Sequence, residues 1–266
     1  MSPTLQTLVQ RLDNNALCEA NVIPWSCPVP SFGDLRESTI ATLGLNPSNR
    51  EFVDGSGNEL DGSSRRFHTL KSLGLARWSK ASSQHLRLIA ESCRRYFSHN
   101  PYDGWFRKLD ALISGTRASY YHQTFRACHL DLIPYATACK WTELTQRQRT
   151  MLLEYSGDAL GLLLRDSPVR LVILNGRTVV DTLQMIANVD LECEKVSDWT
   201  LPRRSSSGVV GFGYRGVIRE IGGVKLRREI VVLGFNHNIQ SSFGVTNKVK
   251  DAIRRWITHH ARKALS

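Results

Sequence analysis

The stretch from Ile40 to Phe52 reads IATLGLNPSNREF, and its character changes abruptly after Leu43. The first residues are apolar and typical of a buried strand, whereas the following GLNPS favours a turn. A buried strand that runs into a polar loop is either a plain strand-to-loop turn or part of an active site at the carboxyl end of a central strand. The other strands of the chain distinguish these two interpretations.

Three further apolar runs end in polar residues. They are expected within ACHLDLIPYA (127–136), within VRLVILNG (169–176), and in the return arm of a hairpin at 208–235 that turns at Gly222 and Gly223. The four strand ends carry GLNPS, LDLIPY, LNG and GFNHNIQSS. Because the carboxyl ends of parallel strands meet at one edge of a sheet, these clusters are expected to form one site.

Helical patterns, with apolar residues three and four positions apart, alternate with these strands. Helices are expected at 6–15, 83–97, 104–115, 146–166, 177–189 and 247–263. The alternation predicts an α/β fold of three layers, α/β/α, with a central four-stranded mainly parallel sheet plus an antiparallel hairpin. We expect one domain over residues 1–266, with a helical and extended segment at 1–37.

The composition points to a polyanionic partner. The chain has 266 residues, of which 41% are hydrophobic, and its 35 Lys and Arg exceed its 24 Asp and Glu to give a net charge of +11. Such an excess favours nucleic acid as the partner, and a merely basic surface is the alternative. No apolar run approaches the roughly 20 residues that cross a bilayer, so no membrane association is expected.

The N-terminal MSPTLQTLVQRLDNN lacks the pattern of a signal peptide, and we expect a cytoplasmic, monomeric protein. None of the six cysteines forms a C-x-x-C pair. The sequence therefore predicts reduced structural cysteines and no metal site.

Four segments together resemble the uracil-DNA glycosylase superfamily. GLNPS is similar to its first motif, especially the Gly-x-Asn-Pro version, and GFNHNIQSS is similar to its second, a His- or Asn-led segment after the last strand. HLDLIPYAT resembles the strand that presents a base-reading side chain, and LVILNG resembles the strand before the second motif. The likeness spans residues 39–263. It implies a uracil-DNA glycosylase-like fold and a monofunctional, cofactor-free DNA glycosylase that flips a nucleotide and leaves an abasic site.

The resemblance implies catalytic roles for residues of both motifs. Asn46 would hold a water under the sugar, since an amide is not a strong base; a turn residue that bonds its own backbone is the alternative. His237 would donate to the charged departing base, much as an oxyanion hole does. A one-residue shift in alignment gives this role to Asn236, and a plain hairpin-end histidine is the alternative for His237.

Asp131 departs from the family pattern, in which uracil readers commonly carry Asn. An ionised Asp only accepts hydrogen bonds, so it suits the amino group of cytosine and repels the C4 carbonyl of uracil. If it points into the pocket, Asp131 therefore predicts a cytosine-type base. The alternative is that it faces away, as a helix cap or a partner of Arg126.

The long Gly-rich loop after Asn46 suggests a roomy pocket, in which Phe52 and Phe67 could stack on the flipped base; core packing is the alternative for each ring. Such a pocket would admit a bulky cytosine, such as the glucosylated hydroxymethylcytosine of some phages. The main hypothesis is thus an anti-phage glycosylase acting on modified cytosine in DNA. A uracil or G:T/G:U mismatch glycosylase of base-excision repair, and a non-catalytic DNA-binding module, are the alternatives.

Small polar and basic residues near the expected site suit contacts with a DNA backbone. The expected contacts are Ser48, Arg65, Arg66, Ser241, Ser242 and Lys248. The last helix begins near the second motif, and a helix N-terminus binds phosphate well. A solvated helical face is the alternative for its basic residues.

Overall fold

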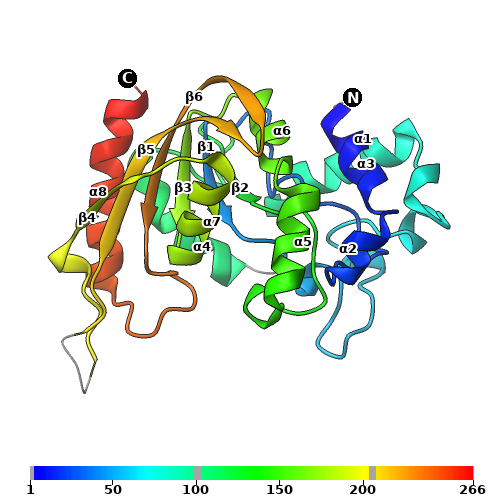
Figure 1. The fold of residues 1–266 in the computed structure, drawn as a ribbon, viewed down its shortest axis with the longest axis horizontal. Helices are drawn as coiled ribbons and strands as arrows, with labels where there is room; N and C mark the ends of the chain where they lie inside the picture. The colour runs from blue at the N-terminus through cyan, green and yellow to red at the C-terminus, as the bar shows by residue number, and fades with distance from the viewer. Residues whose placement is uncertain (1–2, 99–102, 204–207, 266) are drawn as a thin grey trace.

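A computed structural model describes residues 3–98, 103–203 and 208–265, and its centre is a six-stranded sheet (Figure 1). The strand order is β2-β1-β3-β6-β5-β4. The strands are β1 Ile40–Gly44, β2 Ala127–Asp131, β3 Leu171–Asn175, β4 Glu192–Lys195, β5 Phe212–Ile221 and β6 Val224–Phe235.

The first four strands in this order run parallel and in register. Strand β1 pairs with β2 on one side and with β3 on the other, and β3 pairs with β6. Gly44 at the end of β1 lies opposite Asp131 at the end of β2, and Asn175 at the end of β3 lies opposite Phe235. The predicted convergence of four carboxyl ends on one edge, at the bottom of Figure 1, is confirmed.

The hairpin is confirmed, and the sheet carries one strand more than the sequence predicts. Strands β5 and β6 are antiparallel and turn at Gly222 and Gly223, which have φ of +56° and +78°. Strand β4 then pairs with β5 at the outer edge of the sheet. Its sequence, ECEK, is exposed at all four positions and has no apolar pattern from which a strand could be predicted.

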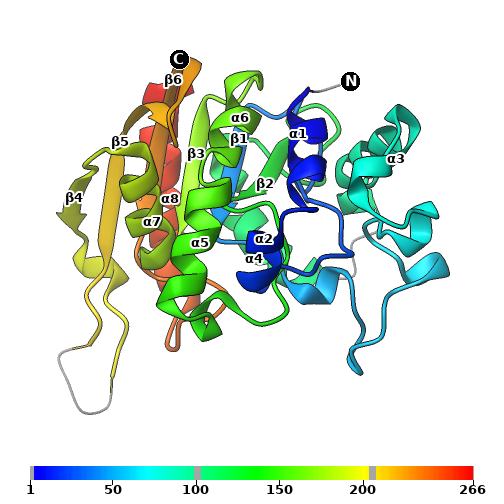
Figure 2. The same ribbon diagram turned by 45° about the vertical axis from the view of Figure 1, so that its right-hand side comes forward.

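Helices cover both faces of the sheet, as expected for an α/β fold. Figure 2 shows α5, α6 and α7 in front of the sheet and α4 and α8 behind it, while α1, α2 and α3 lie beyond β2. The helices are α1 Pro3–Arg11, α2 Asn15–Glu19, α3 Ser83–Arg94, α4 Asp103–Ile113, α5 Gln146–Ser156, α6 Ala159–Arg165, α7 Arg177–Ala187 and α8 Asn247–Leu265.

The prediction of a single helix over 146–166 is wrong, because this segment forms two helices, α5 and α6. The break falls at Gly157 and Asp158, where the Asp158 carboxylate accepts bonds of 2.6 and 2.7 Å from Arg11. A Cβ at Gly222 would lie 2.6 Å from Asp158 Cα, so the tip of the hairpin packs on this break. The break therefore serves as a contact point for both α1 and the hairpin.

The N-terminal segment continues from α1 and α2 into an extended run that closes the β2 side of the sheet. Phe32 exchanges two backbone hydrogen bonds with His129, of 2.8 and 2.9 Å, on the outer side of β2. Among the described residues, none of the helices is both long and apolar enough to cross a bilayer.

Candidate functional site

The carboxyl edge of the sheet brings the first and middle motifs side by side. Beyond the paired ends of β1 and β2, Leu132 N donates to Gly44 O at 3.1 Å and Ile133 N donates to Leu45 O at 2.9 Å. Because this pairing continues past both strands, Asn46 is held close to the segment that follows Asp131. Two of the predicted site residues are thus anchored on neighbouring backbones.

Asn46 is held with its amide oxygen available. Its Nδ2 donates to Thr137 Oγ1 at 2.9 Å and to Pro47 O at 3.2 Å. The Thr137 hydroxyl donates to Cys139 O, so it can only accept from the amide. Within the described part of the chain, Asn46 Oδ1 has no hydrogen-bond partner, and it can accept a bond from a water molecule.

Asp131 faces inward and lies beside a histidine. Asp131 Oδ1 lies 3.5 Å from His129 Nε2, and the two residues are 5% and 2% exposed. The other ring nitrogen of His129 lies 2.7 Å from Thr42 Oγ1, which in turn contacts Tyr120 Oη at 2.5 Å. Arg126 pairs with Glu37 at 2.7 Å, so it is not the partner of Asp131.

Gly44 makes room for this pair. A Cβ at Gly44 would lie 2.4 Å from Asp131 Oδ1 and 3.0 Å from His129 Nε2. The two side chains of β2 therefore lean across the end of β1, into space that only a residue without a side chain leaves open.

A buried glutamate, which the sequence did not single out, lies near Asp131. Glu51 is 4% exposed and accepts bonds of 2.9 and 3.1 Å from Tyr96 Oη, while Arg66 Nη1 lies 3.4 Å from its carboxylate. Burial raises the pKa of Glu51 to about 7, although Arg66 and Tyr96 favour its charged form; the charge of Asp131 adds to the rise. The edge therefore holds two neighbouring carboxyl groups and one histidine.

The second motif does not contribute the predicted donor, which is a correction. His237 is 2% exposed and its Nε2 lies 2.8 Å from Trp199 O. Asn236 accepts from Phe212 N and donates to Val210 O, both at 2.8 Å. Both side chains therefore bind the connection between β4 and β5 and the first residue of β5. Burial also lowers the pKa of His237, which favours its neutral form.

Phe52 and Phe67 are buried in this structure, so the prediction that their rings stack on a flipped base is wrong. Each is 1% exposed. The Phe67 ring stacks on Tyr96 with centroids 5.3 Å apart, and Phe52 lies against Phe67 at 5.8 Å. The Gly-rich loop buries both rings in an aromatic cluster, so neither offers a face to an incoming base.

The predicted phosphate contacts divide into two groups. Ser48, Ser241 and Lys248 are exposed and Ser242 is half-buried, in segments that follow β1 and β6 at the carboxyl edge. Arg65 and Arg66 instead line a cavity of about 620 Å³ beside α3. Neither Asn46 nor Asp131 lines this cavity, so it is not the roomy base pocket that the sequence predicts around them.

A chain of polar contacts that the sequence did not identify joins β3, the loop after β6 and α4. Asn175 donates to Gln240 Oε1 at 2.7 Å and accepts from Ile239 N at 3.1 Å. Gln240 Nε2 donates to Trp105 O at 3.4 Å, and the Trp105 ring lies 5.5 Å from that of His129. The position of Asn175 at the end of an apolar strand was the available sequence signal.

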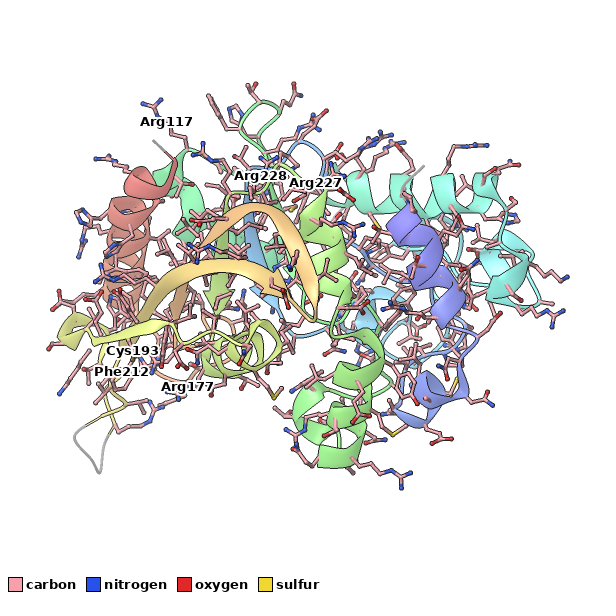
Figure 3. All side chains as sticks on the ribbon, turned by 45° about the horizontal axis from the view of Figure 1, so that its top comes forward. Arg117, Arg177, Cys193, Phe212, Arg227 and Arg228 are labelled. Carbon is pink, nitrogen blue, oxygen red and sulfur yellow. The ribbon has the colours of Figure 1, made fainter. Side chains whose placement is uncertain are left out.

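Positive charge is spread over the surface. Figure 3 shows Arg117 and Arg227 far from Arg177, which follows the carboxyl end of β3. Arg177 is itself partly neutralised, because its guanidinium donates to Asp181 at 2.7 Å and to Tyr214 Oη at 2.9 Å. The net charge therefore does not by itself locate a binding surface.

No model of a known protein family matches the chain, and a search of curated proteins likewise finds no match. Across the described ranges, no three His, Cys, Asp or Glu side chains are grouped so as to hold a metal ion. All six cysteines are free thiols, as predicted.

Replacing Gly44 by Ala should destabilise the protein by about 1–3 kcal/mol, because the new methyl group overlaps the His129–Asp131 pair. Urea unfolding measures this loss. Gly55→Ala is the matched control, since a Cβ at Gly55 meets no atom within 4 Å. Equal unfolding midpoints for the two variants would contradict the close packing at Gly44.

Replacing Glu51 by Gln should change how stability depends on pH. The folded protein keeps the Glu51 proton up to a pKa of about 7, whereas the unfolded chain releases it near its ordinary pKa of about 4.3. The contribution of Glu51 to the free energy of unfolding is therefore fully present below pH 4.3. It falls by roughly 3 kcal/mol in total as the pH rises to 7.

Urea unfolding at several pH values between 4.5 and 7.5 tests this dependence. Glu51→Gln should lack the decline, so its stability relative to the unmodified protein should increase with pH. Glu229→Gln, at a side chain 57% exposed, is the control. Parallel stability curves for Glu51→Gln and the unmodified protein would show that the pKa of Glu51 is not raised.

Proposed function

We propose that this protein is a monofunctional DNA glycosylase with a uracil-DNA glycosylase-like fold, and that it removes a modified cytosine from DNA. The observation that carries the proposal is the placement of Asn46 and Asp131 at the ends of two paired parallel strands. One presents a fixed amide oxygen and the other a carboxylate. The amide oxygen can hold an attacking water, and the carboxylate can accept a hydrogen bond from the edge of a base.

The reaction is hydrolysis of the C1′–N bond of a flipped nucleotide. Asn46 Oδ1 accepts a hydrogen bond from the attacking water, and the bonds to Thr137 and Pro47 hold that oxygen in place. Because an amide takes up no proton, the bond to the base breaks largely before the water adds. Asn46 thus acts by positioning rather than as a base.

Asp131 reads the base. Its carboxylate accepts a hydrogen bond from the amino group at C4 of cytosine, a pairing that carboxylates make with this base. Since Asp131 is only 5% exposed, the base reaches it by displacing the side chains that cover the edge. Flipping itself costs a few kcal/mol, which contacts inside the site offset.

The departing base needs a proton, and His237 is engaged elsewhere, with its Nε2 2.8 Å from Trp199 O. We assign the task to His129, whose Nε2 lies 3.5 Å from Asp131 Oδ1: the proton on His129 passes to the departing base, and the ring takes back the proton that the water releases when it adds to C1′. The Thr42 hydroxyl on the other ring nitrogen of His129 fixes the ring. The assignment replaces the second-motif donor with a donor on the base-reading strand.

An exposed aromatic side chain supports nucleic acid as the partner. Phe243, in the loop after β6, is 80% exposed. The Arg203 guanidinium lies 5.3 Å from its ring centroid and donates to its carbonyl at 2.9 Å. An apolar wedge beside a cation suits insertion between bases and contact with the flanking phosphate. Removal of a modified cytosine would serve defence against phage DNA.

A non-catalytic DNA-binding module is the second candidate. The observation that favours it is that buried His237 and half-buried Asn236 are engaged in structural hydrogen bonds with Trp199, Val210 and Phe212. Removal of uracil or of a mismatched base is disfavoured by Asp131, whose carboxylate repels the C4 carbonyl of uracil and thymine.

The test measures bases released from DNA by mass spectrometry, with substrates that contain glucosylated hydroxymethylcytosine, cytosine or uracil. Asn46→Ala should lower base release on the order of 100-fold, because the water loses its position. Asn49→Ala is the control, since this neighbouring amide donates to Ala138 O and takes no part in the proposed chemistry. Release from none of the substrates by the folded protein would favour the binding module.

Asp131→Asn tests base recognition in the same assay. An amide can donate as well as accept, so the variant should gain uracil release relative to cytosine release. Release of uracil alone by the unmodified protein would keep the reaction class and reject the role given to Asp131.

A further inference from the structure

The cavity beside α3 is a second candidate site that neither Asn46 nor Asp131 lines, although two of its lining residues, Arg66 and Tyr96, also contact Glu51. Its volume of about 620 Å³ lies within the range of pockets that hold small molecules. One wall is the loop after β1 and the other is α3 with the turn that follows it. The lining is Asp54, Leu60, Ser63, Ser64, Arg65, Arg66, His68, Leu88, Glu91, Ser92, Arg95 and Tyr96.

The cavity presents positive charge. In the described part of the chain, no carboxylate lies within 4 Å of the Arg65 guanidinium. Arg95 approaches Glu91 only at 3.9 Å and is 61% exposed. Arg66 is 15% exposed, and its Nη1 donates to Arg50 O at 2.7 Å, which fixes the guanidinium at the inner wall.

The two acidic residues of the lining are already engaged. Asp54 accepts backbone bonds from Ser56 and Asn58, at 2.8 and 2.9 Å, and these bonds lower its pKa. Glu91 pairs with Arg94. The carboxylates of the lining therefore leave the Arg65 guanidinium available to an anion, whereas Arg66 is held by Glu51 and Arg95 lies near Glu91. Guanidinium groups bind phosphate with two parallel hydrogen bonds.

The remaining lining suits the rest of a nucleotide. The Ser63 and Ser64 hydroxyls can bond phosphate or sugar oxygens. Leu60, Leu88 and Tyr96 form an apolar side, and Leu88 is 41% exposed although it is a large aliphatic residue. A ligand with an anionic end and a flat apolar body would fill both parts.

We propose that this cavity binds a nucleotide through its phosphate, either as one unit of a DNA strand or as a free nucleoside monophosphate. The proposal stands on the cavity alone and holds whether or not the protein releases bases. The three arginines distinguish it from a site for a neutral sugar, which carboxylates and amides would line.

Isothermal titration calorimetry tests the proposal with thymidine 5′-monophosphate, thymidine, glucose and the trinucleotide TpTpT. The monophosphate should bind at least about tenfold tighter than thymidine, since charge-assisted hydrogen bonds contribute that much. Tighter binding of TpTpT than of the monophosphate identifies a DNA strand as the source, and the reverse identifies a free nucleotide.

The Arg65→Ala/Arg95→Ala double variant should weaken binding of the phosphate probes at least about tenfold. Arg87→Ala is the matched control, because Arg87 is exposed on the same helix and does not line the cavity. Arg95→Glu alone provides a second variant at an exposed position, and thermal melting verifies that each variant is folded.

Three results would overturn the proposal: no binding of either phosphate probe, binding of glucose or thymidine that equals theirs, or phosphate binding that Arg65 and Arg95 do not affect. The base-release assay is separate. Loss of base release in Asn46→Ala with unchanged nucleotide binding separates the two sites.

Discussion

The absence of a side chain at Gly44 is the constraint on which the carboxyl edge depends. Strand β1 is central, with β2 and β3 on either side, so its last residue meets side chains from the neighbouring strand. His129 and Asp131 occupy the space above Gly44, and the parallel register sets Asp131 directly opposite it. Asn46 follows two residues later on the same backbone. One glycine thus determines how closely β2 and the loop after β1 approach each other.

Hydrogen bonds and ion pairs with neighbouring side chains, rather than solvent, stabilise the buried ionisable groups at this edge. Tyr96 and Arg66 hold Glu51, and Thr42 holds the ring of His129 beside Asp131. Because charges separated from water interact strongly, the charge of Asp131 adds to the raised pKa of Glu51. A ligand that reached these groups would displace hydrogen bonds that now satisfy them, so it would have to supply donors and acceptors in their place.

Much of the fold could be predicted because it is encoded in residue periodicity. The apolar runs that end in GLNPS, LDLIPY and LNG became the parallel strands, since continuous burial on both faces requires such runs. Strand β4 could not be predicted, because an exposed edge strand needs no apolar residue. The helix break at Gly157 arises from contacts with α1 and the hairpin, which lie far away in sequence.

The placement of the candidate site residues could be predicted in part, because a sequence shows which residues follow a strand and not where their side chains point. Asn46 and Asp131 lie at paired strand ends, and their positions follow from register. The side chains of His237 and Asn236 turn toward Trp199 and Phe212, whose positions depend on the long connection between β4 and β5. The sequence allowed Phe52 and Phe67 either to stack on a base or to pack in the core. In the structure both pack in the core, Phe52 against Trp25 and Phe67 against Tyr96.

The two edge strands of the sheet, β2 and β4, are protected against pairing with strands of other molecules. At one end, the backbone of Phe32 occupies the outer hydrogen-bonding groups of His129 in β2. At the other end, β4 is four residues long and presents the charges of Glu192, Glu194 and Lys195. Short charged edges and covered edges discourage strand addition between molecules. The sheet is therefore not a template for aggregation at either of its outer strands.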